Sequence, residues 1–146
     1  MPMYRWDDLQ EVLITPSHTP SKGKVIMGKH LILQRNLNVG DRGDGFPGAT
    51  THSHPEEQII MNLQKTNRIR VGNEWFTMLP GDVVVIPPYV DHETISESGN
   101  LNYNIRSRVP GHSWYDGSWV PGAKEEWEHI QMLLAEMDRK YKEKTP

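Results

Sequence analysis

The sequence contains no cysteine among its 146 residues. This absence excludes a disulfide scaffold, a thiol nucleophile and any metal site built from thiolates, so a metal would have to be held by histidine, carboxylate or amide side chains. No apolar run approaches the ~18 residues that span a bilayer, and residues 1–13 lack the basic and apolar regions of a secretion signal. We therefore expect a cytoplasmic protein with no membrane partner.

A large excess of basic charge is also missing. The sequence has 16 Lys and Arg against 19 Asp and Glu, a net charge of −3, and its basic residues are scattered. A nucleic-acid interface needs basic residues clustered on one surface, so we expect no nucleic-acid partner. The length fits one domain, and the 36% hydrophobic share is modest but adequate for a globular core.

The 11 prolines and 12 glycines divide the chain into short segments, which favours strands over a helical bundle. Strands are predicted in residues 24–37, with a break at Gly28, and in residues 82–86, which resemble a buried apolar strand. Residues 101–109 alternate between apolar and polar side chains and predict another strand. Residues 38–51 are rich in glycine and are interpreted as a turn-forming connection.

A hairpin is predicted where residues 68–71 and 74–78 flank the two-residue turn Gly72-Asn73. Residues 4–13 are compatible with a short helix or an irregular arm. The expected fold is therefore all-β, a barrel or sandwich, followed by a C-terminal helix.

The expected organisation is an N-terminal arm (residues 1–23), a barrel (residues 24–110) and a C-terminal segment (residues 111–146). The C-terminal segment begins with an aromatic loop and continues as a helix with an apolar stripe, formed by Trp127, Ile130, Leu134, Met137 and Tyr141. This stripe would pack on the barrel or on a second subunit, and we expect a homodimer.

The most informative segment is His-Ser-His-Pro-Glu-Glu-Gln at residues 52–58. In a strand, residues two apart point to the same side, so His52 and His54 can direct two imidazoles at one point. Imidazole nitrogens suit a borderline divalent metal ion. A third histidine, His92, closes a second segment that begins at Gly81 and includes Pro87.

These two segments resemble the paired motifs of the cupin superfamily, and the resemblance covers about residues 34–108. It implies a jelly-roll β-barrel in which His52, His54, Gln58 and His92 hold one divalent transition metal ion: nickel, zinc, manganese or iron. Gln58 stands where the motif usually has glutamate. Strict strand alternation would instead favour Glu56 as the fourth ligand, although Pro55 can reset the alternation.

Other positions depart from the cupin motifs. The leading glycine of the first motif is displaced to Gly45, and its trailing glycine is Lys65. The glycine of the second motif is Tyr89, three residues before His92, where a phenol could narrow the mouth of the pocket or take part in catalysis.

The closest resemblance in motif is to small cupins of pectin and alginate breakdown, which convert unsaturated uronates to linear keto acids. A metal held by four neutral ligands keeps its full charge and would polarise a carbonyl or enol oxygen. The implied function is non-redox isomerase, lyase or cyclase chemistry on a small, oxygen-rich, anionic substrate. The alternatives are an iron(II) dioxygenase and a non-catalytic module that binds a small molecule.

Two arginines are further candidates for the site. Arg106 and Arg108 share one strand face with Asn102 and Asn104. If this face lines the barrel, Arg106 would act in catalysis and Arg108 would clamp a substrate carboxylate. A solvated outer face is the alternative explanation.

Three aromatic or basic candidates complete the prediction. Tyr103 is a candidate general acid or base, or else a core residue. Arg35 is a candidate substrate ligand, but it lies on the strand face opposite Gln34, so only one of the two can point inward. Trp114, in the aromatic loop, would cover an organic substrate or else be buried in a subunit contact.

Overall fold

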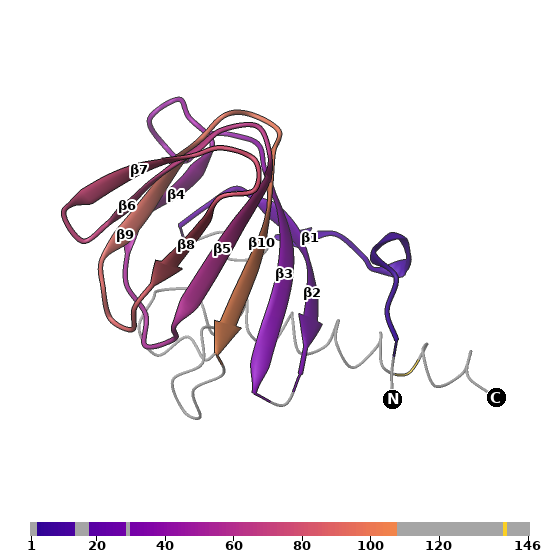
Figure 1. The fold of residues 1–146 in the computed structure, drawn as a ribbon. Helices are drawn as coiled ribbons and strands as arrows, with labels where there is room; N and C mark the ends of the chain where they lie inside the picture. The colour runs from indigo at the N-terminus through magenta and orange to yellow at the C-terminus, as the bar shows by residue number, and fades with distance from the viewer. Residues whose placement is uncertain (1–2, 14–17, 29, 108–138, 140–146) are drawn as a thin grey trace.

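The computed structural model describes residues 3–13, 18–28, 30–107 and 139, which form two antiparallel sheets that face each other (Figure 1). The larger sheet has the order β1 (Val12–Leu13), β2 (Lys22–Met27), β3 (Leu31–Asn38), β10 (Asn100–Ser107), β5 (Gln58–Gln64) and β8 (Val83–Ile86). The smaller sheet has the order β4 (Gly48–His52), β9 (His92–Ser96), β6 (Asn67–Val71) and β7 (Glu74–Met78). The predicted all-β jelly roll is confirmed.

The turns explain why the strands begin and end where they do. Gly28 lies between β2 and β3, and its N–H donates a hydrogen bond to the carbonyl of Leu31 at 2.8 Å. The predicted β6–β7 hairpin is confirmed, with Gly72 at φ 58°, a left-handed conformation that glycine adopts without steric cost. The N-terminal residues form a single 3-10 turn, η1 (Trp6–Asp8), followed by β1.

The interior has an apolar part and a polar part. Ile60, Ile69, Met78 and Ile86 form a buried cluster between β5 and β8 on one side and β6 and β7 on the other. Along β10, the buried positions are Asn100, Asn102, Asn104 and Arg106, while the positions between them are more exposed. The face of β10 that carries the asparagines is therefore the inner face.

Strand β8 differs from its prediction. Val83 and Val85 are half exposed, and only Ile86 of this strand is fully buried. The physical reason is that alternate side chains of a strand point to opposite faces of its sheet, and only the inner face of the larger sheet faces the smaller sheet. No helix among the described residues is long and apolar enough to cross a membrane. The predicted C-terminal helix and aromatic loop lie outside the described residues, apart from Arg139.

Candidate metal centre

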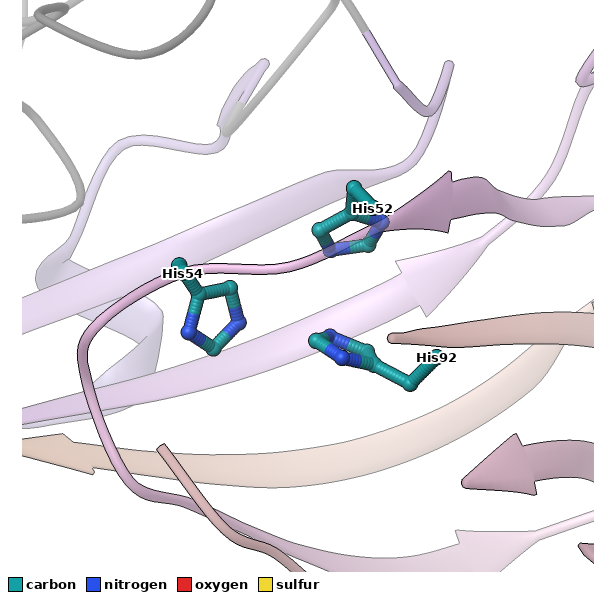
Figure 2. A group of neighbouring side chains, drawn as sticks. All are labelled: His52, His54 and His92. Carbon is teal, nitrogen blue, oxygen red and sulfur yellow. The ribbon is translucent and has the colours of Figure 1, made fainter. Parts of the chain in front are cut away.

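Three histidines converge at one end of the space between the sheets. His52 ends β4, His54 follows two residues later in the loop, and His92 begins β9 directly opposite His52. Their rings point toward one another (Figure 2), and one ring nitrogen of each lies within 4.8 Å of the others. His54 lies beyond the end of the strand, so the convergence depends on the loop as well as on the alternation of β4.

Each of the three rings is held through its Nδ1 atom. The carbonyl oxygens of Thr50, Glu56 and Val90 lie 2.6, 3.0 and 2.9 Å from Nδ1 of His52, His54 and His92, respectively. Because a carbonyl oxygen can only accept a hydrogen bond, each Nδ1 carries a proton. In a neutral ring the lone pair is then on Nε2, and this nitrogen is the one that can bind a metal ion.

The environment keeps these rings neutral. Burial lowers the pKa of His54 to about 2, and the positive charge of Arg106 adds to this effect. Burial likewise lowers the pKa of His92 to about 4 and that of His52 well below its ordinary value. At neutral pH the cluster therefore presents uncharged nitrogen donors without a proton to displace.

Gln58 and Glu56 lie on opposite sides of the His54 ring. The Oε1 atom of Gln58 is 3.0 Å from Nε2 of His54, whereas Oε2 of Glu56 is 3.5 Å from Nδ1. With the proton of His54 on Nδ1, the contact between Oε1 and Nε2 brings two lone pairs together, which a shared cation would make favourable. The geometry therefore favours Gln58 over Glu56 as a fourth donor.

A cavity of about 60 Å³ adjoins the histidines, which is room for a few water-sized groups. Its lining includes His52, His92 and a set of neutral amides from β3 and β10, among them Gln34 and Asn104. Among the described residues that line it, Arg106 is the one charged side chain. The cavity is therefore suited to small polar molecules with hydroxyl or carboxylate oxygens.

The sequence model of the family called AraC-like ligand binding domain matches residues 40–136, about two-thirds of the chain. The chain belongs to this family. No curated protein matches the chain. The matched residues include the whole histidine cluster and Gln58, so the site lies within the family's domain.

Solved structures, several of them described as cupins, share the fold at low sequence identity. An RmlC-like cupin from Shewanella frigidimarina gives a TM-score of 0.61 at 15% identity, covering 75% of this chain and 92% of that one. KdgF from a Halomonas species gives 0.60 at 18% identity, with coverage of 72% and 93%. A cupin-2 domain from Rhodospirillum rubrum gives 0.56 at 17% identity, with coverage of 72% for both chains. The AraC-like family match and these structures place the chain in the cupin superfamily.

Arg106 lies inside the cupin barrel. It is 6% exposed, on the face of β10 that lines the cavity. Its charge contributes to the lowered pKa of each histidine in the cluster, which places it in their electrostatic environment. The face of β10 that carries Asn102, Asn104 and Arg106 therefore lines the barrel, and it is not a solvated outer face. Arg108 and Trp114 lie outside the described residues.

Two other candidates lie away from the cupin cavity, and a third lies next to its histidines. Arg35 and Tyr103 are paired across β3 and β10 on the outer face, where Tyr103 stacks on Trp6 with ring centroids 5.7 Å apart. The Arg35 prediction is therefore wrong, because Gln34 is the residue that points inward. Tyr103 cannot reach the cavity from the outer face. The backbone N–H of Tyr89 donates to the carbonyl of His54 at 2.8 Å, so Tyr89 lies beside the histidine cluster, and its side chain is 71% exposed. A role for its phenol at the mouth of the pocket stays a prediction.

The structure adds one residue that the sequence did not indicate. The His18 ring stacks on His52, with centroids 4.3 Å apart and planes 9° apart. Burial, assisted by the charge of Arg106, lowers the pKa of His18 to about 4. His18 is distant in sequence from the histidine cluster and has no ligand spacing. The tertiary fold alone brings it next to His52.

Proposed function

We propose that this chain is a metal-dependent enzyme of the cupin superfamily that acts on a small, oxygen-rich organic anion by non-redox isomerase, lyase or cyclase chemistry. The observation that carries the proposal is the convergence of three neutral imidazoles, each held through Nδ1 by a backbone carbonyl, beside a polar cavity. Such contacts behind the ring are typical of metal-ligating histidines because they fix the tautomer and the orientation.

The proposed ligands are His52, His54, His92 and Gln58, and the ion is nickel, zinc, manganese or iron. When bound, a divalent ion would polarise a carbonyl or enol oxygen of the substrate. Because all four side chains are neutral, the protein leaves the charge of the ion uncompensated. The site would therefore favour anionic ligands.

The cavity residues supply binding and orientation. The guanidinium of Arg106 would hold a substrate carboxylate, and its burial strengthens that interaction by excluding water. The amides of Gln34 and Asn104 would bind hydroxyl groups. An unsaturated uronate is the first substrate to test, because the histidine and glutamine motif resembles that of the uronate-linearising cupins.

The test compares turnover by metal-free protein and by protein loaded with nickel, zinc, manganese or ferrous iron, under anaerobic conditions, by NMR of the uronate. We expect turnover that requires metal but not oxygen, is lost in His92→Ala and is retained in His30→Ala, a control at an exposed histidine. The same assay is run in parallel in air, and turnover that appears only there, consumes oxygen and requires ferrous iron would replace this proposal with a dioxygenase.

A ligand-binding module without catalysis is a second candidate, favoured by the description of the family to which the chain belongs. Such a module would bind its ligand with undiminished affinity after His92→Ala and would turn over no substrate with any metal. The enzyme proposal requires both the affinity for the anion and the turnover to fall in that variant.

A further inference from the structure

A continuous row of buried amides runs from Gln58 into the barrel. The Nε2 of Gln58 donates to Oδ1 of Asn104, and Nδ2 of Asn104 donates to Oδ1 of Asn102. Asn102 then donates through Nδ2 to Oδ1 of Asn100 at 3.1 Å, and Asn100 donates to Oδ1 of Asn62 at 2.6 Å. We call these five residues the amide ladder. Each member is 4% exposed or less, so water cannot readily replace these bonds.

The far end of the amide ladder fixes its direction. Nδ2 of Asn62 donates to the backbone carbonyls of Lys65, at 2.7 Å, and Met78, at 3.1 Å. Nδ2 of Asn100 likewise donates to the carbonyl of Gln64 at 2.8 Å. Carbonyl oxygens only accept hydrogen bonds, so neither amide can exchange its oxygen and nitrogen positions without placing oxygen against oxygen.

This constraint is transmitted to Gln58. Once Oδ1 of Asn100 is fixed as an acceptor, Asn102 must donate to it, and the same requirement passes to Asn104. Gln58 must then direct its NH₂ group at Asn104, which leaves Oε1 facing Nε2 of His54 at 3.0 Å. A reversed Gln58 would direct N–H groups at the histidine cluster and could not donate an oxygen to a cation there.

The same constraint distinguishes glutamine from glutamate at position 58. A glutamate carboxylate would place an acceptor oxygen against Oδ1 of Asn104, with no proton between them. The side-chain amide of Gln58 supplies that proton. This gives a physical reason for a glutamine where the cupin motif usually has glutamate.

We infer that the amide ladder is a positioning device that holds the carbonyl oxygen of Gln58 toward the histidine cluster, with Asn104, Asn102, Asn100 and Asn62 as positioning residues. The inference rests on the proposed function, because it gives Gln58 the role of a metal ligand. It predicts that an asparagine that does not contact the cluster affects metal affinity through Gln58.

The test is a double-mutant cycle with cobalt(II) as the probe. Asn102→Leu removes the middle of the amide ladder with little change of volume, and Gln58→Leu removes the ligand. We expect Asn102→Leu to weaken cobalt binding about 10-fold, as outer contacts to metal ligands typically do. In the Gln58→Leu background the same change should have no effect, because Gln58 is no longer there to be oriented. The cobalt absorption spectrum should change in Asn102→Leu as it does in Gln58→Leu.

Asn67→Leu is the matched control. Asn67 is 1% exposed and accepts a hydrogen bond from Ser96 at 2.8 Å, but it is not a member of the amide ladder. The Asn67→Leu protein should be less stable than the wild type but should bind cobalt with the same affinity. Equal loss of affinity from Asn102→Leu in both backgrounds, or equal loss from Asn67→Leu, would overturn the inference while leaving the metal site intact. Absence of cobalt binding by the wild type would overturn the proposed function as well.

A measurement on the wild type does not depend on whether a variant folds. In metal-free protein, the side-chain NH₂ protons of Gln58 should show nuclear Overhauser contacts to the side chain of Asn104. Contacts from these protons to the ring of His54 instead would mean that the amide is reversed and would overturn the inference.

Discussion

At the scale of single residues, burial lowers the pKa values of the three clustered histidines and so holds their rings in the neutral form. His92 has its pKa lowered to about 4, from an ordinary value of 6.5, chiefly because burial disfavours the charged ring. Above pH 6.5 the ring is neutral in both folded and unfolded chains and adds no pH dependence. Below pH 6.5 the unfolded chain takes up the proton first, so stability falls with pH until the folded ring also titrates.

The first prediction follows from this loss of stability as the pH falls below 6.5. Between pH 7 and pH 5, metal-free wild type should lose about 2 kcal/mol more stability than metal-free His92→Gln, because 1.5 pH units below the unfolded pKa are worth about that much. Urea unfolding of both proteins at the two pH values, in the presence of a chelator, measures the difference. Parallel losses in the two proteins would mean that His92 is not buried as a neutral ring.

The second prediction concerns Arg106, whose positive charge lies near both the histidines and the cavity. Arg106→Met should weaken binding of glycolate to metal-loaded protein about 10-fold or more, because a charged hydrogen-bonding partner is lost. Ethylene glycol, a neutral molecule of similar size, should bind the two proteins equally. Metal affinity should rise, since a repelling charge is removed. Calorimetric titration measures the affinities for glycolate, for ethylene glycol and for the metal ion. An equal loss of affinity for glycolate and for ethylene glycol would rule out an anion clamp.

At the scale of elements, the sequence predicted the strands but did not always predict which face of a strand points into the barrel. Alternation in β10 separates Leu101, Tyr103 and Ile105 from the asparagines, yet it does not say which set is inside. The usual rule puts apolar side chains inward, and here it fails because the amide ladder satisfies its own hydrogen bonds. The same exception explains why Tyr103, which alternates with Leu101 and Ile105, lies on the outer face and not in the core.

The candidate site was predictable to a similar extent. Two motifs were enough to bring His52, His54 and His92 together, because β4 and β9 are neighbours in the smaller sheet. The amide ladder and the stacking of His18 on His52 join residues that are distant in sequence. No spacing in the sequence carries that information, since it depends on how β10 pairs with β3 and β5.

The third prediction concerns the turn that precedes β9. Tyr89 has φ 64°, a left-handed conformation, at the position where the cupin motif has glycine. Tyr89→Gly should therefore raise the free energy of unfolding by about 1 kcal/mol relative to Tyr89→Ala, which keeps the strained conformation. Thermal unfolding compares the two variants. Both should keep the wild-type metal affinity, and loss of metal from either one would show that the phenol contributes to the site.

At the scale of the whole molecule, exposed apolar side chains gather on the outer face of the larger sheet, on β10, β5 and β8. Ile105, Ile59 and Val85 are paired in one row across β10, β5 and β8, and Met61 and Val83 are paired in the next. Met61, Val83, Val85 and Ile105 are between 37% and 51% exposed. An apolar surface of this kind is typical of a contact with another chain.

The fourth prediction is that the protein is a homodimer that uses this face. Sedimentation at micromolar concentration should give twice the mass of the chain, and Val85→Lys should shift the protein toward monomer because it buries a charge in the contact. Thr77→Lys, on exposed β7 of the other sheet, is the control and should leave the mass unchanged. A wild-type monomer would contradict the prediction.

The central claim is that the histidine cluster binds one metal ion, and elemental analysis of purified, reconstituted protein tests it most directly. We expect about one equivalent of a transition metal in the wild type and in His30→Ala, where the histidine is exposed, and a reduced content in Gln58→Ala. The metal should be lost in His92→Ala, because only two imidazoles and the neutral amide of Gln58 would remain as donors. A wild-type protein that retains no metal after reconstitution, or a His92→Ala variant that retains all of it, would contradict the account.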